Sequence, residues 1–164
     1  MDINTVLKTL LFTILIPGSV TVGIPYVLLT SGLAVSFEIG QWRFVGSIPI
    51  VLGIAAYIWT AGDFITSGKG TPAPLDPPKL LVSRRLYRIV RNPMYIGVLL
   101  VLFGGAVLFA SLVLLIYTVL VWFAFHLFVI YYEEPKLEQK FGLQYSIYRE
   151  AVPRWIPKLK RVRD

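Results

Sequence analysis

Two adjacent carboxylates, Glu133 and Glu134, follow a long apolar stretch. They are the residues of this sequence that could most clearly take part in binding or catalysis. Carboxylates at the end of an apolar helix are costly unless a positive charge meets them. That charge could come from Arg91, Arg88 or Lys136, which would make a structural ion-pair cluster. It could also come from a cationic ligand. The sequence pattern alone leaves both possibilities open.

Tyrosine side chains are dense around the two glutamates, and the faces of aromatic rings attract cations. The tyrosines concerned are Tyr87, Tyr95, Tyr131, Tyr132, Tyr145 and Tyr148. Tyrosine enrichment is also typical of the interface between a membrane and water. The rings therefore fit either a cation site or an interfacial belt.

His126 is the single histidine and lies inside an apolar stretch. An ionisable group inside a membrane span can mark a functional site, but a lone histidine is more often packed as a neutral ring against a neighbouring helix. No second histidine forms a metal pair with it, and the chain contains no cysteine. We therefore expect no metal site and no disulfide scaffold.

The elements that must position these residues are predicted from where charges are absent. The 164 residues are 56% apolar and 15% charged, whereas a soluble domain has about 45–50% and about 25%. Residues 9–37, 44–62 and 92–132 contain no charged residue and are 29, 19 and 41 residues long. Because about 20 helical residues span a bilayer, the first two stretches hold one span each. The third must fold back as a hairpin, with its reversal at 109–112.

We therefore predict an all-α, polytopic membrane protein with four transmembrane helices, forming a single domain over residues 1–164. The predicted spans cover about 6–30, 44–62, 93–109 and 112–132. They leave a cytoplasmic loop at 63–92 and a cytoplasmic tail at 133–164 that contains a helical segment.

The distribution of basic residues sets the predicted orientation. Of the 16 Lys and Arg residues, 14 lie within 63–91 and 133–164. Cytoplasmic flanks of membrane spans collect such residues, so both segments and both termini are expected in the cytoplasm. The net charge of +7 is then explained by orientation and by anionic headgroups, and we expect no nucleic-acid partner.

The hairpin should bring its two ends together. Pro93 suits the first turn of a helix, with Asn92 as the N-cap residue. Pro135 is expected to stop or bend the last span. Because a hairpin returns its end beside its beginning, Asn92, Tyr95 and the two glutamates should meet at one membrane surface.

The C-terminal half resembles the integral-membrane methyltransferases related to isoprenylcysteine carboxyl methyltransferase and phosphatidylethanolamine N-methyltransferase. The shared pattern is LV and LY pairs, R-(H/N)-P-x-Y-x-G, a helical hairpin, EE, FG-x2-Y-x2-Y and a terminal VP. In this chain it occupies residues 81–82, 86–87, 91–97, 133–134, 141–148 and 152–153.

The resemblance implies that S-adenosylmethionine binds beside the hairpin on the cytoplasmic face. The implied cofactor-contacting residues are Lys79, Leu80, Leu81, Val82, Tyr87, Asn92, Pro93, Met94, Tyr95 and Glu133. A carboxylate and tyrosine rings favour the sulfonium and ammonium groups of this cofactor. The N-cap region at Asn92 can receive its carboxylate.

The implied reaction is methyl transfer to a membrane-resident amphiphilic acceptor. Because the sequence carries no organelle signal, we expect an integral-membrane protein of a prokaryotic plasma membrane. The acceptor is either a phospholipid amine or an isoprenylcysteine-type carboxylate. The carboxyl methyltransferases carry histidine where this chain has Asn92, and arginine where it has Val129. NPMY and YEEP are closer to the phospholipid N-methyltransferases, whereas FGLQYSIYREAVP is closer to the carboxyl methyltransferases. An amine acceptor would require a base, for which Glu134 and His126 are candidates.

Two other functional classes fit the same architecture. One is an NADPH-dependent membrane reductase of the steroid 5α-reductase kind, which would bind the dinucleotide instead. The other is a non-enzymatic membrane scaffold or small transporter subunit, in which the polar residues would be structural pairs and interface anchors. The sequence makes no prediction of oligomeric state.

Overall fold

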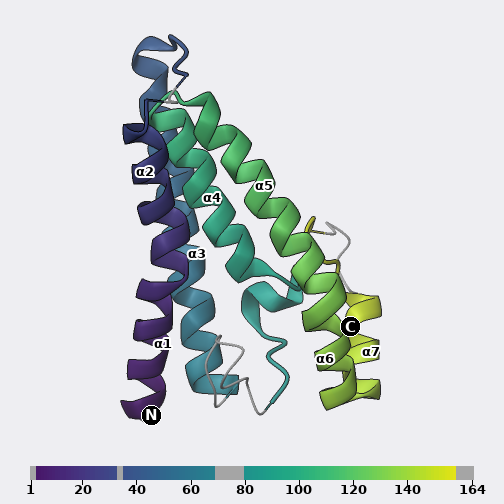
Figure 1. Cartoon of the computed structure of the whole chain (residues 1–164). Helices are drawn as coiled ribbons and strands as arrows, with labels where there is room; N and C mark the ends of the chain where they lie inside the picture. The colour runs from purple at the N-terminus through teal and green to yellow at the C-terminus, as the bar shows by residue number, and fades with distance from the viewer. Residues whose placement is uncertain (1–2, 33–34, 69–79, 158–164) are drawn as a thin grey trace.

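The computed structural model describes residues 3–32, 35–68 and 80–157 (Figure 1). This described part contains helices and no strand, which confirms the predicted all-α class. The first helical stretch runs over Ile3–Thr30. It consists of α1 (Ile3–Leu15), a wide π-type turn η1 (Ser19–Gly23) and α2 (Ile24–Thr30).

The second helical stretch contains η2 (Gly40–Gly46), α3 (Ser47–Asp63) and η3 (Phe64–Gly68). After the segment outside the described residues, a short 3₁₀ turn, η4 (Arg85–Arg88), precedes α4 (Pro93–Leu108). The remaining helices of the described part are α5 (Leu112–Phe128), η5 (Val129–Glu133), α6 (Glu134–Phe141) and α7 (Leu143–Ala151).

Three helical stretches are long and apolar enough to cross a membrane, namely Ile3–Thr30, Gly40–Thr66 and Leu112–Phe141. The helix α4 is equally apolar but has 16 residues. Large apolar side chains cover the outside of the bundle, as Leu120 does with 61% exposure. An apolar exterior of this kind requires lipid as its solvent. The described fold is therefore that of an integral membrane protein.

The reversal between α4 and α5 lies where the sequence predicts it. Ala110 adopts the left-handed conformation with φ of 46°, and Ser111 caps α5 by accepting a hydrogen bond from the amide of Leu114 at 3.4 Å. The connection before η2 pairs with this turn. The amide of Phe37 donates to the Ala110 carbonyl at 3.0 Å, and the amide of Leu112 donates to the Val35 carbonyl at 2.9 Å.

Four glycines let α3 and α4 approach each other closely. A Cβ on Gly53 would lie 2.4 Å from the carbonyl oxygen of Gly97, and one on Gly46 would lie 2.5 Å from that of Gly104. Gly46 and Gly53 are seven residues apart, as are Gly97 and Gly104, which is about two helical turns. Gly105, by contrast, has no neighbour near its missing Cβ. Small residues at such positions allow backbone-to-backbone packing in membranes, and here they fix where α4 begins.

Two helices continue beyond the predicted membrane spans. The last helix does not stop at Pro135 but continues through α6 to Phe141 and ends at Gly142, whose φ is 52°. Pro135 lies in the first turn of α6, directly after the wide turn η5, and a proline is tolerated there. The helix of α3 likewise continues through η3, past the predicted start of the loop at residue 63.

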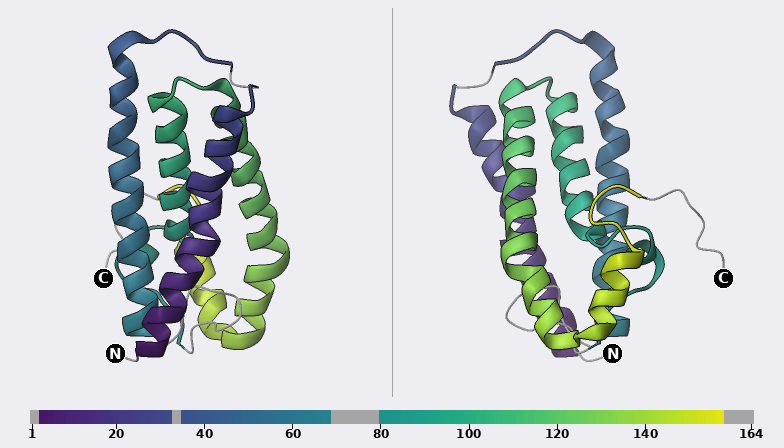
Figure 2. Two further views of the ribbon diagram at one scale, coloured as in Figure 1. Left: turned by 60° about the vertical axis from the view of Figure 1, so that its left-hand side comes forward. Right: turned by 90° about the vertical axis from the view of Figure 1, so that its right-hand side faces the viewer.

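The two ends of the bundle differ in character. The start of α1, the start of α4 and the helices α6 and α7 lie at one end, and the α4–α5 turn lies at the other (Figure 1, Figure 2). The helices α4 and α5 diverge toward the first end, where the C-terminal segment lies beside them. The candidate functional residues therefore gather where the hairpin opens.

Candidate active site

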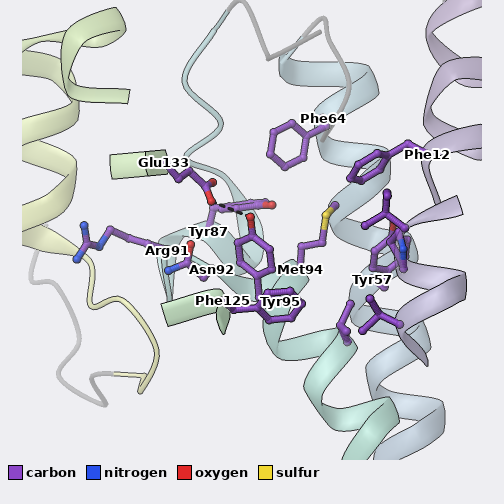
Figure 3. A pocket seen from close by; sticks show the side chains of 14 residues that line it. Phe12, Tyr57, Phe64, Tyr87, Arg91, Asn92, Met94, Tyr95, Phe125 and Glu133 are labelled. Atoms are coloured by element: carbon purple, nitrogen blue, oxygen red, sulfur yellow. Dashed lines mark hydrogen bonds between the residues drawn. The ribbon is translucent and has the colours of Figure 1, made fainter. Parts of the chain in front are cut away.

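A cavity of about 100 Å³ lies where α4 begins and η5 ends (Figure 3). Its wall is built from α1, η1, α3, η3, the segment before α4, α4 itself, α5 and η5. The lining residues are Phe12, Ile16, Pro17, Val20, Tyr57, Phe64, Tyr87, Arg91, Asn92, Met94, Tyr95, Val98, Phe125 and Glu133. Helices from both halves of the chain thus enclose one mostly apolar space that is rich in aromatic rings.

The structure brings half of the predicted cofactor-contacting residues to this cavity. These are Tyr87, Asn92, Met94, Tyr95 and Glu133. The hairpin therefore returns Glu133 to the start of α4, as its length predicts. In Figure 3 the side chains of Met94 and Tyr95 extend into the space from the first turn of α4.

The remaining predicted cofactor residues do not line the cavity. Pro93 is buried in the first turn of α4. Leu80 is exposed, Leu81 is partly buried and Val82 is buried, and all three precede η4. Lys79 lies outside the described residues.

Glu133 has a single neutral partner in the cavity wall. The hydroxyl of Tyr95 donates a hydrogen bond of 2.8 Å to its Oε2 atom. The Tyr95 ring packs against Phe125 with centroids 4.7 Å apart, which holds the hydroxyl in place. Within the described part of the chain, no lysine or arginine forms an ion pair with Glu133. Among the described residues, this carboxylate therefore faces the cavity without a compensating cation.

Glu134 has the opposite environment. Arg154 donates to both of its carboxylate oxygens at 2.7 and 2.9 Å, and Arg91 forms an ion pair with it at 3.0 Å. Adjacent residues of a helix point in directions about 100° apart. The side chain of Glu133 therefore lines the cavity, whereas that of Glu134 does not. Arg91 points away from the cavity toward the C-terminal segment in Figure 3.

The structural-pair hypothesis is therefore correct for one glutamate only. Of the three cations that the sequence offered, Arg91 pairs with Glu134. Lys136 instead donates to the hydroxyl of Tyr132 at 2.7 Å, and Arg88 makes no ion pair with either glutamate in the described chain. The second cation is Arg154, which the sequence gave no reason to choose because it lies twenty residues further along the chain.

Three tyrosines near the glutamates stay neutral. Burial, together with the negative charge of Glu133, raises the pKa of Tyr87 well above its usual value. Burial also raises the pKa of Tyr145 and of Tyr148, whose hydroxyl donates to the Tyr87 carbonyl at 2.7 Å. Tyr87 therefore offers the cavity a hydrogen-bond donor and not a base. The hydrogen bond to Glu134 raises the pKa of Arg154, which keeps its charge.

The C-terminal segment 152–155 ties this region together. The amide of Arg91 donates to the Pro153 carbonyl at 2.8 Å, and the side chain of Asn92 donates to the Arg154 carbonyl at 3.2 Å. Asn92 is the N-cap residue of α4, but its side chain forms no capping hydrogen bond. The predicted N-cap position is therefore confirmed, while the side-chain amide group donates to the C-terminal segment.

His126 lies outside the cavity wall. Its Nδ1 atom accepts a hydrogen bond of 3.0 Å from the indole of Trp155, and its ring stacks on Trp122 with centroids 5.3 Å apart. An Nδ1 atom that accepts this bond carries no proton, so a neutral ring carries its proton on Nε2. His126 is thus packed and hydrogen-bonded between two indoles.

A model of the phospholipid methyltransferase family matches residues 29–144 of the chain. The chain belongs to this family. Comparison with curated proteins and with solved structures finds no match. The matched region includes α3, α4, α5 and α6, and with them Tyr87, Tyr95 and both glutamates.

Part of the cavity of this phospholipid methyltransferase family member could not be foreseen. The aromatic residues Phe12, Tyr57, Phe64 and Phe125 line it without belonging to any motif. Tyr57 gave a weak signal, because a hydroxyl inside an apolar stretch needs a partner, and it shares a hydrogen bond of 2.9 Å with Thr13. The three phenylalanines gave no such signal in the sequence. In the described residues, no group of three or more metal-ligating side chains is gathered in one place.

Proposed function

We propose that this protein transfers a methyl group from S-adenosylmethionine to the amine of a membrane phospholipid. The observation that carries the proposal is the contrast between the two glutamates. Glu134 is neutralised by two arginines, whereas Glu133 faces an aromatic cavity with a phenol as its hydrogen-bond partner. A buried carboxylate without a cation is the feature that a cationic ligand would complete.

The residues present fit the sulfonium end of the cofactor. S-adenosylmethionine, when bound, supplies an electrophilic methyl group on a positively charged sulfur. Glu133 attracts that charge, and the rings of Tyr87 and Tyr95 add the attraction that aromatic faces exert on cations. The Tyr95 hydroxyl fixes the carboxylate, so that little reorganisation is needed on binding.

The other predicted contacts belong to the rest of the cofactor. Met94 lines the cavity beside Tyr95, and Asn92 lines it at the start of α4. We propose that Leu80, Leu81 and Val82, with Lys79 and Pro93, contact the cofactor beyond the cavity, because they flank the segment that carries Tyr87. These contacts would orient the reacting atoms and exclude water, from which most of the rate enhancement in a methyl transfer can arise.

An amine acceptor fits the charges of the site better than a carboxylate. Val129, at the position of the arginine of the carboxyl methyltransferases, is 1% exposed and apolar. Arg91 lines the cavity, but its guanidinium group points out of it toward Glu134 (Figure 3). A substrate carboxylate would thus meet an uncompensated Glu133, whereas a phospholipid ammonium group is attracted to it.

The amine must lose a proton before its lone pair can attack the methyl carbon. Neither of the predicted bases lines the cavity. Both oxygens of Glu134 accept hydrogen bonds from Arg154, and Nδ1 of His126 accepts one from Trp155. In the described part of the chain, Glu133 is the carboxylate of the cavity wall, and we propose that it takes the proton.

The proposed orientation places this end of the bundle in the cytoplasm. The arginines of η4 and its neighbours, and those of α7 and the C-terminal segment, gather at the end that holds the cavity. Basic flanks are typical of cytoplasmic membrane surfaces. A water-soluble cofactor would enter from that side, and the lipid acceptor would come from the bilayer.

The test uses purified protein in detergent, methyl-labelled S-adenosylmethionine and either phosphatidylethanolamine or a farnesylcysteine analogue. We expect labelled N-methylated phospholipid by mass spectrometry. Glu133→Gln should abolish labelling, whereas Glu138→Gln, which alters an exposed ion pair, should not. Labelling of the farnesylcysteine carboxylate alone would contradict the amine acceptor. A melting temperature raised by NADPH and not by S-adenosylmethionine would favour a reductase and overturn the proposal.

A further inference from the structure

A second hollow lies outside the cavity, on the α4–α5 hairpin. It is an open groove of about 470 Å³, several times as large as the cavity. Residues that line it include Leu99, Phe103, Leu115, Val119, Trp122 and Trp155. Thr118 also lines the groove, but its hydroxyl donates to the Leu114 carbonyl of its own helix at 2.8 Å. The groove therefore offers a ligand an almost exclusively hydrocarbon surface.

The groove and the cavity are separated by two neighbouring rings, those of Trp155 and Tyr95. The ring of Trp155 lies 6.4 Å from that of Tyr95, centroid to centroid, and Tyr95 holds Glu133. Trp155 lines the groove, whereas Tyr95 lines the cavity. The indole of Trp155 is fixed by its hydrogen bond to His126. A molecule seated in the groove would thus have its end at the wall of the proposed active site.

A positive charge beside Trp155 favours a phospholipid over other ligands that carry a hydrocarbon chain. Arg154 precedes it in the chain and belongs to the cluster with Arg91 and Glu134. Two guanidinium groups and one carboxylate leave this cluster with a net charge of +1. A phosphodiester at the end of the groove would meet that charge, and an acyl chain would match the apolar walls.

We infer that the groove between α4 and α5 seats one acyl chain of a phospholipid acceptor, with Trp155 between the chain and the reacting end. The inference rests on the proposed function and extends it from the acceptor amine to the acceptor chain. If the groove seats the chain, Val119 and Trp155 determine the specificity for the acceptor chain. Acceptors with long chains should react more efficiently than those with short chains, because only long chains fill the groove.

The kinetic test compares two neighbouring residues of α5. Val119→Trp places an indole in the groove, whereas Leu120→Trp places one on the exposed outside of the helix. For dioleoyl-phosphatidylethanolamine we expect Val119→Trp to lower kcat/KM about tenfold or more, the equivalent of two lost methylene contacts. The kcat/KM for dihexanoyl-phosphatidylethanolamine and the affinity for S-adenosylmethionine should be unaffected. Leu120→Trp should behave as wild type with both lipids.

A binding measurement separates this inference from the proposed reaction. Native mass spectrometry of the detergent-solubilised protein counts retained dioleoyl-phosphatidylethanolamine molecules. We expect Val119→Trp to lose one molecule that wild type and Leu120→Trp retain, even if no methyl transfer is detected. Val119→Phe, a smaller change, should show a partial loss if the tryptophan variant does not fold.

Several results would overturn the inference. Equal losses of kcat/KM for long and short chains would show that Val119→Trp acts through the fold and not through the groove. Unchanged retention of the phospholipid in Val119→Trp would show that lipid binds elsewhere or only as a nonspecific annulus. Preferential retention of a farnesylcysteine analogue by wild type would assign the groove to a prenyl chain instead.

Discussion

Glu133 and Glu134 are neighbours in the chain and belong to two different regions of the molecule. Glu134 lies among Arg91, Arg154 and the C-terminal segment, and its charge is compensated by the chain itself. Glu133 lies in an aromatic cavity and receives one hydrogen bond from Tyr95. The helical rotation between consecutive residues places one carboxylate in each region.

The difference teaches how to separate a structural charge from a functional one. The Glu134 cluster joins three segments that are distant in sequence, namely the loop before α4, α6 and the C-terminal segment. Its arginines would be costly to leave unpaired. The cavity around Glu133 is closed by apolar contacts, and its charge contributes nothing obvious to the fold. We therefore expect substitutions in the two regions to affect different properties.

The largest effect on folding is expected from Glu134→Ala. The change leaves Arg91 and Arg154 without a counter-charge in a largely buried site, which costs about 3–5 kcal/mol of unfolding free energy. A large fall in melting temperature in detergent would report this. The matched control is Glu138→Ala, whose exposed partner is Arg149 and whose loss should cost less than about 1 kcal/mol. Similar melting temperatures for the two variants would contradict a structural role for Glu134.

A somewhat smaller effect is expected from Gly53→Leu in the interface between α3 and α4. A Cβ at this position would lie 2.4 Å from the Gly97 carbonyl oxygen, so the helices must move apart at a cost of about 3 kcal/mol. Both regions depend on where α4 begins, so this variant should lose thermal stability and S-adenosylmethionine binding together. Gly105→Leu, where the missing Cβ has no neighbour, should lose neither. Equal loss in both variants would show that the packing of α3 on α4 does not depend on these glycines.

Removal of the Tyr95 hydroxyl should affect the cavity alone. Tyr95→Phe keeps the ring against Phe125 but deletes the donor to Glu133, so we expect S-adenosylmethionine to bind about threefold to tenfold more weakly. Isothermal titration calorimetry measures the affinity, and the melting temperature should change little. Tyr132→Phe, an exposed change outside the cavity, serves as the control. An affinity that Tyr132→Phe lowers as much as Tyr95→Phe would argue against the Tyr95–Glu133 pair.

The smallest effect is expected at the boundary between the two regions. Trp155→Phe removes the indole donor to His126 while keeping an aromatic ring, which should cost about 1 kcal/mol of unfolding free energy. The melting temperature should fall slightly, with S-adenosylmethionine affinity unchanged. A loss of cofactor binding as large as that of Tyr95→Phe would mean that the C-terminal segment contributes directly to the cavity.

Much of the hairpin could be predicted from the sequence, because the determining forces are local. The length of the uncharged stretch 92–132 requires a reversal, and Pro93 marks the start of a helix. These two features suffice to bring Tyr95 and Glu133 together. The continuation of the last helix past Pro135 could not be foreseen, since it depends on the wide turn η5 directly before it.

The contributions from distant segments could not be predicted in the same way. The family resemblance implied Glu133, but residue patterns alone do not tell which of two adjacent glutamates faces a cavity, because that depends on the rotation of the helix. A partner such as Arg154 is defined only by the path of the C-terminal segment. Phe12 and Phe64 reach the cavity because α1 contacts η3, which continues α3, and α3 packs on α4. Their residue type is common to every apolar span, so no pattern marks them.

The most direct test of the account is the affinity of S-adenosylmethionine for Glu133→Gln, measured by isothermal titration calorimetry against wild type and Glu138→Gln. Glutamine keeps the size of the side chain and the possibility of a bond with Tyr95, but removes the charge. The account predicts binding about tenfold to 100-fold weaker in Glu133→Gln, with the other two proteins alike and with no loss of melting temperature without ligand. Unchanged affinity in Glu133→Gln would contradict the claim that Glu133 holds the cation of the cofactor.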